Sequence, residues 1–105
     1  MSTFDLGGLL EQAKKLQERL ASVQDEVAVR TAEGRAGGGM VTAVVNGRLE
    51  VLRVTIDPSL LESPDREMLQ DLVVAAVNDA LREVRALVAA EMQKVTGGLP
   101  IPGLG

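Results

Sequence analysis

Apolar residues recur every three or four positions along the first organised segment, which extends from about residue 5 to residue 26. The recurring positions are Leu9, Ala13, Leu16, Leu20, Val23 and Val27. Alternating steps of four and three form the heptad pattern of a helix with a narrow apolar stripe. Asp5 stands where a helix N-cap is expected. A stripe this narrow packs either on the chain's own sheet or on another helix, and the pattern favours the two interpretations equally.

The middle of the chain changes to a period of two, which predicts three antiparallel strands. The expected strands are residues 27–32, 40–45 and 48–56. A glycine-rich link at residues 34–39 separates the first two strands. Asn46-Gly47 joins the last two and predicts a hairpin with a type I′ turn, because both central residues of that turn need positive φ. The third strand stops at Asp57-Pro58.

Alternation along the predicted strands sorts their side chains into two faces. The apolar face carries Val41, Ala43 and Val45 from the second strand and Leu52, Val54 and Ile56 from the third. Arg53 is expected on the opposite face, away from this apolar set.

A second, wider apolar stripe predicts a long helix from Ser63-Pro64 to about Val95. Serine is a favourable N-cap, and proline is tolerated at the first helical position. The width of the stripe indicates that this helix covers the sheet. Residues 1–96 therefore form a single α+β domain in the order α-β-β-β-α, followed by a flexible Gly/Pro-rich tail at residues 97–105.

A three-stranded antiparallel sheet flanked by two long helices has open edges, and an open edge invites another chain. Helices of 25 to 30 residues are also about 40 Å long, which is more than so small a sheet can cover. Both features predict a homodimer.

The composition excludes several classes of function. The chain has 105 residues with no Cys, His, Trp or Tyr, and Phe4 is its one aromatic residue. Disulfides, Cys/His zinc sites, Ser-His or Cys-His nucleophiles and base-stacking platforms are therefore excluded. We expect no catalytic residue, metal or cofactor. The first ten residues do not resemble a signal peptide, and no apolar run is long enough to cross a membrane, so we expect a cytoplasmic protein with no membrane partner.

Charge argues against a nucleic-acid partner when it is summed over the chain, because 11 basic and 15 acidic residues give a net charge of −4. Local clusters change that conclusion, since a two-fold dimer displays each cluster twice. The candidate DNA-binding residues are Lys14, Lys15 and Arg19 on the first helix and Arg30, Arg48 and Arg53 in or beside the strands. For any single basic residue, a solvated face with intrahelical pairs such as Asp79–Arg82 is the commoner role.

Two other patterns have simpler explanations than ligand binding. Residues 33–39 are glycine-rich, but they lack the Gly-Lys-Ser/Thr ending of a phosphate loop and precede a strand, so they connect strands. Asp57, Glu62, Asp65 and Glu67 lack the spacing of a calcium loop, and acids are favoured near a helix start.

Several blocks occur in an order that is similar to one known family. They are residues 44–47 (VVNG), residues 54–62 (VTIDPSLLE) and residues 67–80 (EMLQDLVVAAVNDA), preceded by residues 7–17 (GGLLEQAKKLQ) and followed by residues 96–100 (TGGLP). The chain resembles the YbaB/EbfC family of bacterial nucleoid-associated proteins. The resemblance implies an α-β-β-β-α protomer, a tweezer-like homodimer with projecting helices, and binding to double-stranded DNA, with no catalytic motif.

Two hypotheses follow. The first is a cytoplasmic, nucleoid-associated homodimer that binds duplex DNA mainly through phosphates and acts in nucleoid organisation or gene regulation. Phosphate contacts are expected because no helix-turn-helix is visible and the basic residues are scattered. The alternative is a protein-interaction module for DNA repair, recombination or replication machinery with little DNA binding of its own. The resemblance favours the first hypothesis, and the acidic balance favours the second.

Overall fold

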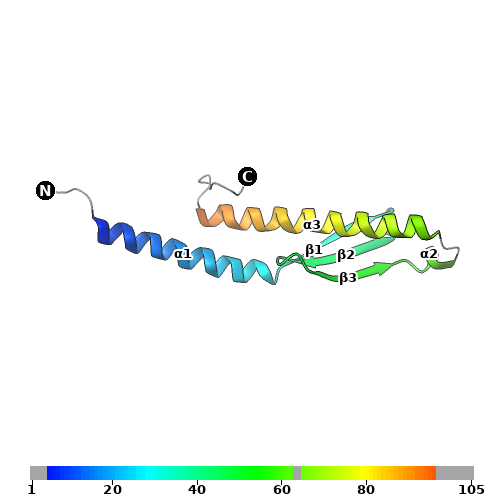
Figure 1. Cartoon of the computed structure of the whole chain (residues 1–105), viewed down its shortest axis with the longest axis horizontal. Coiled ribbons are helices and arrows are strands. Elements are labelled where there is room, and N and C mark those ends of the chain that lie inside the picture. The colour runs from blue at the N-terminus through cyan, green and yellow to red at the C-terminus, as the bar shows by residue number, and fades with distance from the viewer. Residues whose placement is uncertain (1–4, 63–64, 97–105) are drawn as a thin grey trace.

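The computed structural model describes residues 5–62 and 65–96, which form an elongated molecule with two long helices and one small sheet (Figure 1). The elements are α1 (Leu6–Ala28), β1 (Thr31–Ala36), β2 (Val41–Asn46), β3 (Val51–Ile56), the single-turn α2 (Ser59–Glu62) and α3 (Arg66–Thr96). The sheet is antiparallel with strand order β1-β2-β3. The predicted α+β class and α-β-β-β-α order are confirmed, with α2 as an addition.

The core lies between α3 and one face of β1 and β2. Its buried side chains are Val41, Ala43, Val45, Leu60, Ala76, Ala80 and Val84. Helix α3 contacts β1 and β2 extensively and β3 only slightly. Every residue of β3 is consequently exposed except the half-buried Ile56. The wide stripe of α3 covers the sheet as predicted, but it leaves one strand nearly bare.

Helix α1 begins as the sequence predicts and continues further than expected. The Asp5 carboxylate accepts a hydrogen bond from the Gly8 N–H at 3.0 Å, which confirms Asp5 as the N-cap. The predicted strand start at Val27 is wrong, because Val27 is buried in the last turn of α1. Val27 continues the helical stripe, and this outweighs the short alternation with Val29. Strand β1 begins only at Thr31.

The β2–β3 hairpin lies where Asn46-Gly47 predicts it, but the predicted type I′ turn is wrong. Leu49 has the positive φ, +64°, whereas Gly47 is not among the described residues with positive φ. The Leu49 N–H donates to the Asn46 carbonyl, and the Asn46 N–H donates to the Glu50 carbonyl, so three residues form the loop. The Asn46 side chain supports the loop by accepting from the N–H groups of Arg48 and Glu50.

Gly47 is needed for a different reason from the one the sequence suggests. A Cβ at this position would overlap the carbonyl group of Val27. The Gly47 N–H also donates to the Arg30 carbonyl at 3.0 Å. Gly47 therefore allows the end of α1 to pack directly against the β2–β3 connection, where Val27 is only 5% exposed.

A β-bulge alters the predicted faces of β3. Val44 pairs with Arg53, whereas Val45 pairs with Val51, so Leu52 is the extra residue. The expected grouping of Val54 and Ile56 with the core face is confirmed, because they pair with Ala43 and Val41. Leu52, which was expected to share this face, is instead the extra residue of the bulge, and Val51 pairs with Val45.

The predicted glycine link is shorter than expected, because β1 passes through Gly34. A Cβ on Gly34 would overlap the backbone of Ala76 and Ala80 in α3. Glycine at this position therefore permits close contact between helix and strand. The turn between β1 and β2 uses Gly37, Gly38 and Gly39, which all have positive φ.

Asp65 caps α3, since its carboxylate accepts from the Met68 N–H at 3.1 Å. The predicted cap at Ser63-Pro64 lies outside the described residues, as does the predicted tail at residues 97–105. Among the described helices, none is long and apolar enough to span a membrane.

Candidate nucleic-acid interface

The six predicted DNA-binding residues fall into two groups rather than one patch. Lys14, Lys15 and Arg19 lie on α1, which projects away from the sheet (Figure 1). Arg48 and Arg53 lie on the β2–β3 connection and on β3. These five side chains are exposed, and none forms an ion pair with another residue in the described ranges. Their charges are therefore available to solvent.

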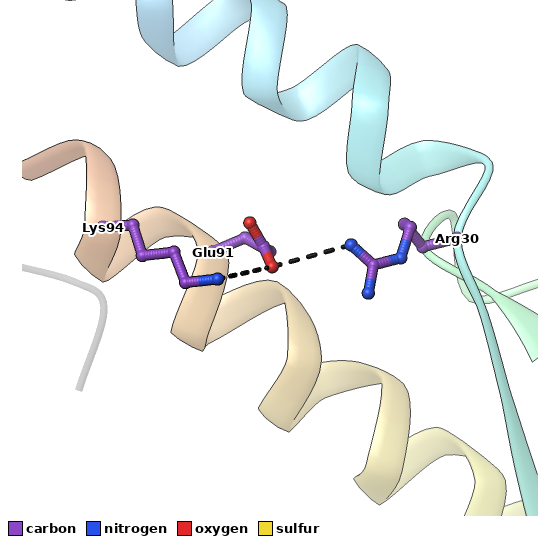
Figure 2. Close-up of polar contacts among 3 residues, drawn as sticks. All are labelled: Arg30, Glu91 and Lys94. Carbon is purple, nitrogen blue, oxygen red and sulfur yellow. Dashed lines mark hydrogen bonds and ion pairs between the residues drawn. The ribbon is translucent and has the colours of Figure 1, made fainter.

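Arg30 differs from the other five because it has a carboxylate partner among the described residues. Its guanidinium lies 3.6 Å from the Glu91 carboxylate, and the Lys94 ammonium lies 3.2 Å from the same oxygen. Figure 2 shows Arg30 and Lys94 approaching Glu91 from opposite sides. Arg30 belongs to the link between α1 and β1, whereas Glu91 belongs to α3. The pair thus joins the residues after the C-terminal end of α1 to the C-terminal part of α3.

Two of the three cations of α1, Lys14 and Lys15, are on the side of the helix that faces away from its apolar stripe, whereas Arg19 flanks the stripe. With 3.6 residues per turn, Lys14 and Lys15 lie about 100° or more around the axis from Leu16 and Leu20. The stripe residues closest to the sheet are half-buried or buried, which directs the stripe toward the rest of the fold. Lys14 and Lys15 therefore face outward.

Arg53 is on the face of the sheet that α3 does not cover. It pairs with Val44, whose neighbours Ala43 and Val45 point to the opposite face, into the core. The prediction that Arg53 faces away from the apolar set is confirmed. Arg35 is on the same uncovered face, since it pairs with Thr42.

Arg35 is not among the predicted residues, because Gly34 and the glycines after it indicate a link in the sequence instead of a strand. The Arg35 guanidinium pairs with Glu33 at 3.0 Å, and both side chains are well exposed. Arg66 and Arg85 are further exposed cations that form no ion pair within the part of the chain that the structure describes. The predicted pair between Asp79 and Arg82 is present at 3.4 Å.

Negative charge is concentrated at the end of the molecule that carries α2 and the start of α3. Residues 57–79, here named the acidic end, contain six carboxylates and one guanidinium, a net charge of −5. The carboxylates are Asp57, Glu62, Asp65, Glu67, Asp71 and Asp79. Since the whole chain carries −4, the remaining residues carry +1. In Figure 1 the acidic end lies opposite the projecting part of α1.

One carboxylate in the acidic end has a shifted pKa. Hydrogen bonds from the backbone and the side chain of Ser59 lower the pKa of Asp57 below its ordinary value. The Ser59 N–H lies 2.9 Å from the Asp57 carboxylate, at the start of α2. Asp57 therefore holds the turn between β3 and α2. No cluster of three or more His, Cys, Asp or Glu with metal-binding geometry exists among residues 5–62 and 65–96.

The two edges of the sheet differ in their accessibility. Asp79 of α3 accepts a hydrogen bond from the Arg35 N–H of β1 at 2.9 Å. Asp79 thus occupies a donor that the β1 edge would otherwise offer to another strand. No comparable contact from α3 reaches β3 among the described side-chain hydrogen bonds. The accessible edge is therefore that of β3.

Comparison with known proteins identifies the family. Residues 1–99 match the model of the YbaB/EbfC DNA-binding family. A nucleoid-associated protein of Syntrophobacter fumaroxidans is 55% identical over 95 residues, covering 90% of this chain and 86% of the relative. A nucleoid-associated protein of Thermoanaerobacter pseudethanolicus is 48% identical over 101 residues, covering 96% and 91%. The crystal structure of an uncharacterized protein from Helicobacter pylori aligns with a TM-score of 0.62 and 32% identity, covering 88% and 97%. The chain belongs to the YbaB/EbfC DNA-binding family.

Proposed function

We propose that this chain is a nucleoid-associated protein that binds duplex DNA as a homodimer, mainly through phosphates, and acts in nucleoid organisation or gene regulation. The match to a DNA-binding family over residues 1–99 is the observation that carries the proposal. The names of the relatives from S. fumaroxidans and T. pseudethanolicus support nucleoid association. A cytoplasmic location follows from that association.

The distribution of charge removes the objection that the net charge raises. Charges separated by more than about 10 Å are largely screened at physiological salt. Helix α3 has 31 residues and is about 45 Å long, so the carboxylates at its start are about four screening lengths from the helix's far end. They have little effect on a phosphate that approaches the projecting part of α1, whereas Asp57 and Asp79 lie beside the sheet.

The five unpaired cations are the proposed phosphate contacts: Lys14, Lys15, Arg19, Arg48 and Arg53. Contact with phosphates requires an exposed charge that has no protein partner, and these side chains meet both conditions within the described ranges. Arg30 is the weakest of the six predicted residues, because it alone has a carboxylate partner among the described residues. It shares this partner, Glu91, with Lys94.

Strand β3 is the proposed dimer contact. Val51, Leu52 and Val54 are 36% to 54% exposed on a strand whose edge is accessible. A symmetric dimer that uses this surface would bury apolar side chains and pair an open edge. Light scattering should give about twice 11.1 kDa, with refractive-index detection because the chain lacks Trp and Tyr. Leu52→Lys should lower this mass, whereas Val74→Lys, at an exposed position on α3, should leave it unchanged.

DNA binding is tested by measuring the affinity for a labelled duplex at several salt concentrations. Each lost phosphate contact should reduce the slope of log K against log salt by about 0.9. Replacing Lys14, Lys15 and Arg19 with Gln, or Arg48 and Arg53 with Gln, should weaken binding equally on unrelated sequences. Arg66→Gln is the matched control, since Arg66 is also exposed but lies in the acidic end.

The outcomes separate the proposals. If both multiple variants bind DNA as the parent does, the contact residues are wrong. If only one DNA sequence loses affinity, base readout replaces phosphate contact. If the parent binds no DNA even at low salt, the chain acts as an interaction module for recombination or replication proteins, which its acidic end would suit.

A further inference from the structure

The apolar stripe of α1 has no cover along its outer half within the described residues. Leu6, Leu9, Leu10 and Leu16 are 64%, 49%, 69% and 44% exposed. Nearer the sheet, Leu20 and Val23 are half-buried and Val27 is buried. The stripe thus changes from covered to bare along one helix. Leu6 and Leu10 widen the stripe here, since Leu10 lies about 100° around the helix from Leu9. We name Leu6, Leu9, Leu10 and Leu16 the leucine stripe.

The change occurs because α3 is too short to accompany α1. The two helices contact each other near the sheet, and the Arg30–Glu91 pair aligns them there. From Glu91, α3 continues for five residues to Thr96, or about 8 Å. From Arg30, α1 extends back to Leu6, or about 36 Å. Figure 1 shows α1 continuing past the end of α3.

The chain therefore leaves α3 beside α1, about 13 Å before Leu16 along the helix. The residues that follow, 97–105, have the sequence GGLPIPGLG. They carry no charge and include three large apolar side chains, Leu99, Ile101 and Leu104. From the end of α3 the segment must cover about 28 Å to reach Leu6, and nine extended residues span up to about 30 Å. In an extended conformation the segment is therefore long enough to follow the stripe.

We propose that residues 97–105 dock along the outer half of α1, with Leu99, Ile101 and Leu104 against the leucine stripe. Pro100 and Pro102 favour this arrangement, because a fixed φ lowers the conformational entropy that docking costs. Docking removes apolar surface from water on both segments. The segment supplies the cover that α3 is too short to provide.

A second copy of α1 is a less suitable occupant. The bare part of the stripe extends over about one and a half heptads, whereas a coiled coil normally needs three or four. A segment on the same chain competes at an effective concentration in the millimolar range when the link is short. Gly97 and Gly98 form such a link directly after α3.

The docked segment leaves Lys15 accessible and runs beside Lys14. Lys15 lies about 100° or more around the helix from every member of the leucine stripe, whereas Lys14 is one turn after Leu10 and borders the stripe. The test of docking needs no DNA, so its outcome does not depend on whether the chain binds DNA.

The chain has no cysteine, so one introduced cysteine gives a unique labelling site. We suggest attaching a nitroxide to Gly105→Cys in the full chain and recording the intensity of every backbone amide by NMR. Docking predicts a selective loss of intensity at residues 6–16. The amides at the start of α3, at the other end of the molecule, should keep their intensity.

Two sets of variants test whether the leucine stripe is responsible. Leu9→Gln with Leu16→Gln should restore the lost intensity, whereas Val74→Gln, at an exposed apolar position on α3, should not. Leu99→Gln with Leu104→Gln should restore it as well, and this variant lies outside the described fold. Unchanged intensity at residues 6–16, or a loss that survives both double variants, would overturn the proposal.

Dilution distinguishes a neighbouring chain from the same chain. The labelled protein is unfolded, mixed with a large excess of unlabelled wild type of natural isotope content, and refolded. Docking within one chain predicts that the intensity loss persists. A loss that fades on dilution would show that another copy supplies the segment, which also overturns the proposal.

Discussion

Replacing Gly47 with Ala should destabilise the fold, and the reason is steric contact rather than turn geometry. Gly47 is absent from the described residues with positive φ, so its backbone conformation does not itself require glycine. An added Cβ would overlap the Val27 carbonyl and lie 3.1 Å from the Ala28 Cα. Backbone atoms at the end of α1 cannot rotate aside as a side chain could. The end of α1 must therefore move away from the β2–β3 connection.

The size of the effect follows from what that movement breaks. Val27 would lose its burial, which stabilises by about 1.5–3 kcal/mol for a fully buried side chain of this type. The hydrogen bond from the Gly47 N–H to the Arg30 carbonyl contributes about 0.5–1.5 kcal/mol. The free energy of unfolding should fall by about 2–4 kcal/mol. For a domain of this size, Tm should fall by roughly 10–25 °C.

Thermal unfolding followed by far-ultraviolet circular dichroism measures this loss, at one protein concentration for all variants. Replacement by asparagine separates the two explanations, because asparagine tolerates positive φ better than alanine but still carries a Cβ. If only φ mattered, asparagine would be the milder replacement at Gly47. Gly47→Asn should cost as much as Gly47→Ala. Gly38→Asn should cost little, since Gly38 has φ +67° and open space around its Cβ position. A Gly47→Asn variant with the Tm of the parent would refute the steric explanation.

Three further predictions concern the remaining contacts. Gly34→Ala should lower the free energy of unfolding by about 3 kcal/mol, because the added Cβ pushes α3 away from β1. Urea unfolding measures this loss, and a midpoint equal to that of the parent would contradict the close contact between α3 and Gly34. Arg30→Gln should cost less than about 1 kcal/mol, because the pair with Glu91 is at the surface, and added salt should remove the difference from the parent. Asp57 should stabilise the fold only while it is ionised, because Ser59 hydrogen bonds lower its pKa in the folded state. The advantage of the parent over Asp57→Asn should be complete at neutral pH and should shrink as pH falls through the lowered pKa, as urea midpoints across a pH series would reveal.

The periodicity of the sequence predicts the elements well, and it fails where a residue satisfies two patterns. Val27 fits both the helical stripe of α1 and an alternation with Val29. The buried contact at the end of α1 decides in favour of the helix, and that contact joins residues far apart in the sequence. Gly34 and Gly47 likewise indicate turns to a local analysis, and Gly47 does lie in one whereas Gly34 lies in β1. At both positions glycine is also needed because another backbone approaches closely, which depends on the tertiary fold.

The basic residues of the candidate interface can be listed from the sequence. Whether each of them is exposed and without a carboxylate partner depends on the fold. The sequence gives no reason to treat Arg30 and Lys14 differently, yet of these two only Arg30 has a carboxylate beside it. That carboxylate belongs to Glu91, 61 residues later in the chain. Arg35 was missed because the glycines around it concealed a strand. The segregation of charge, by contrast, is visible in the sequence once residues 57–79 are assigned to one end of the molecule.

The lateral position of α3 decides which part of the sheet remains accessible. Helix α3 contacts β1 and β2 extensively and β3 only slightly. A Cβ on Gly34 of β1 would overlap the backbone of Ala76 and Ala80, so glycine there permits the close approach of α3 to this strand. The same position brings Asp79 to the β1 edge, where it accepts from the Arg35 N–H. Gly34 thus allows α3 to lie over the β1 side of the sheet and leaves β3, at the other edge, open to a partner.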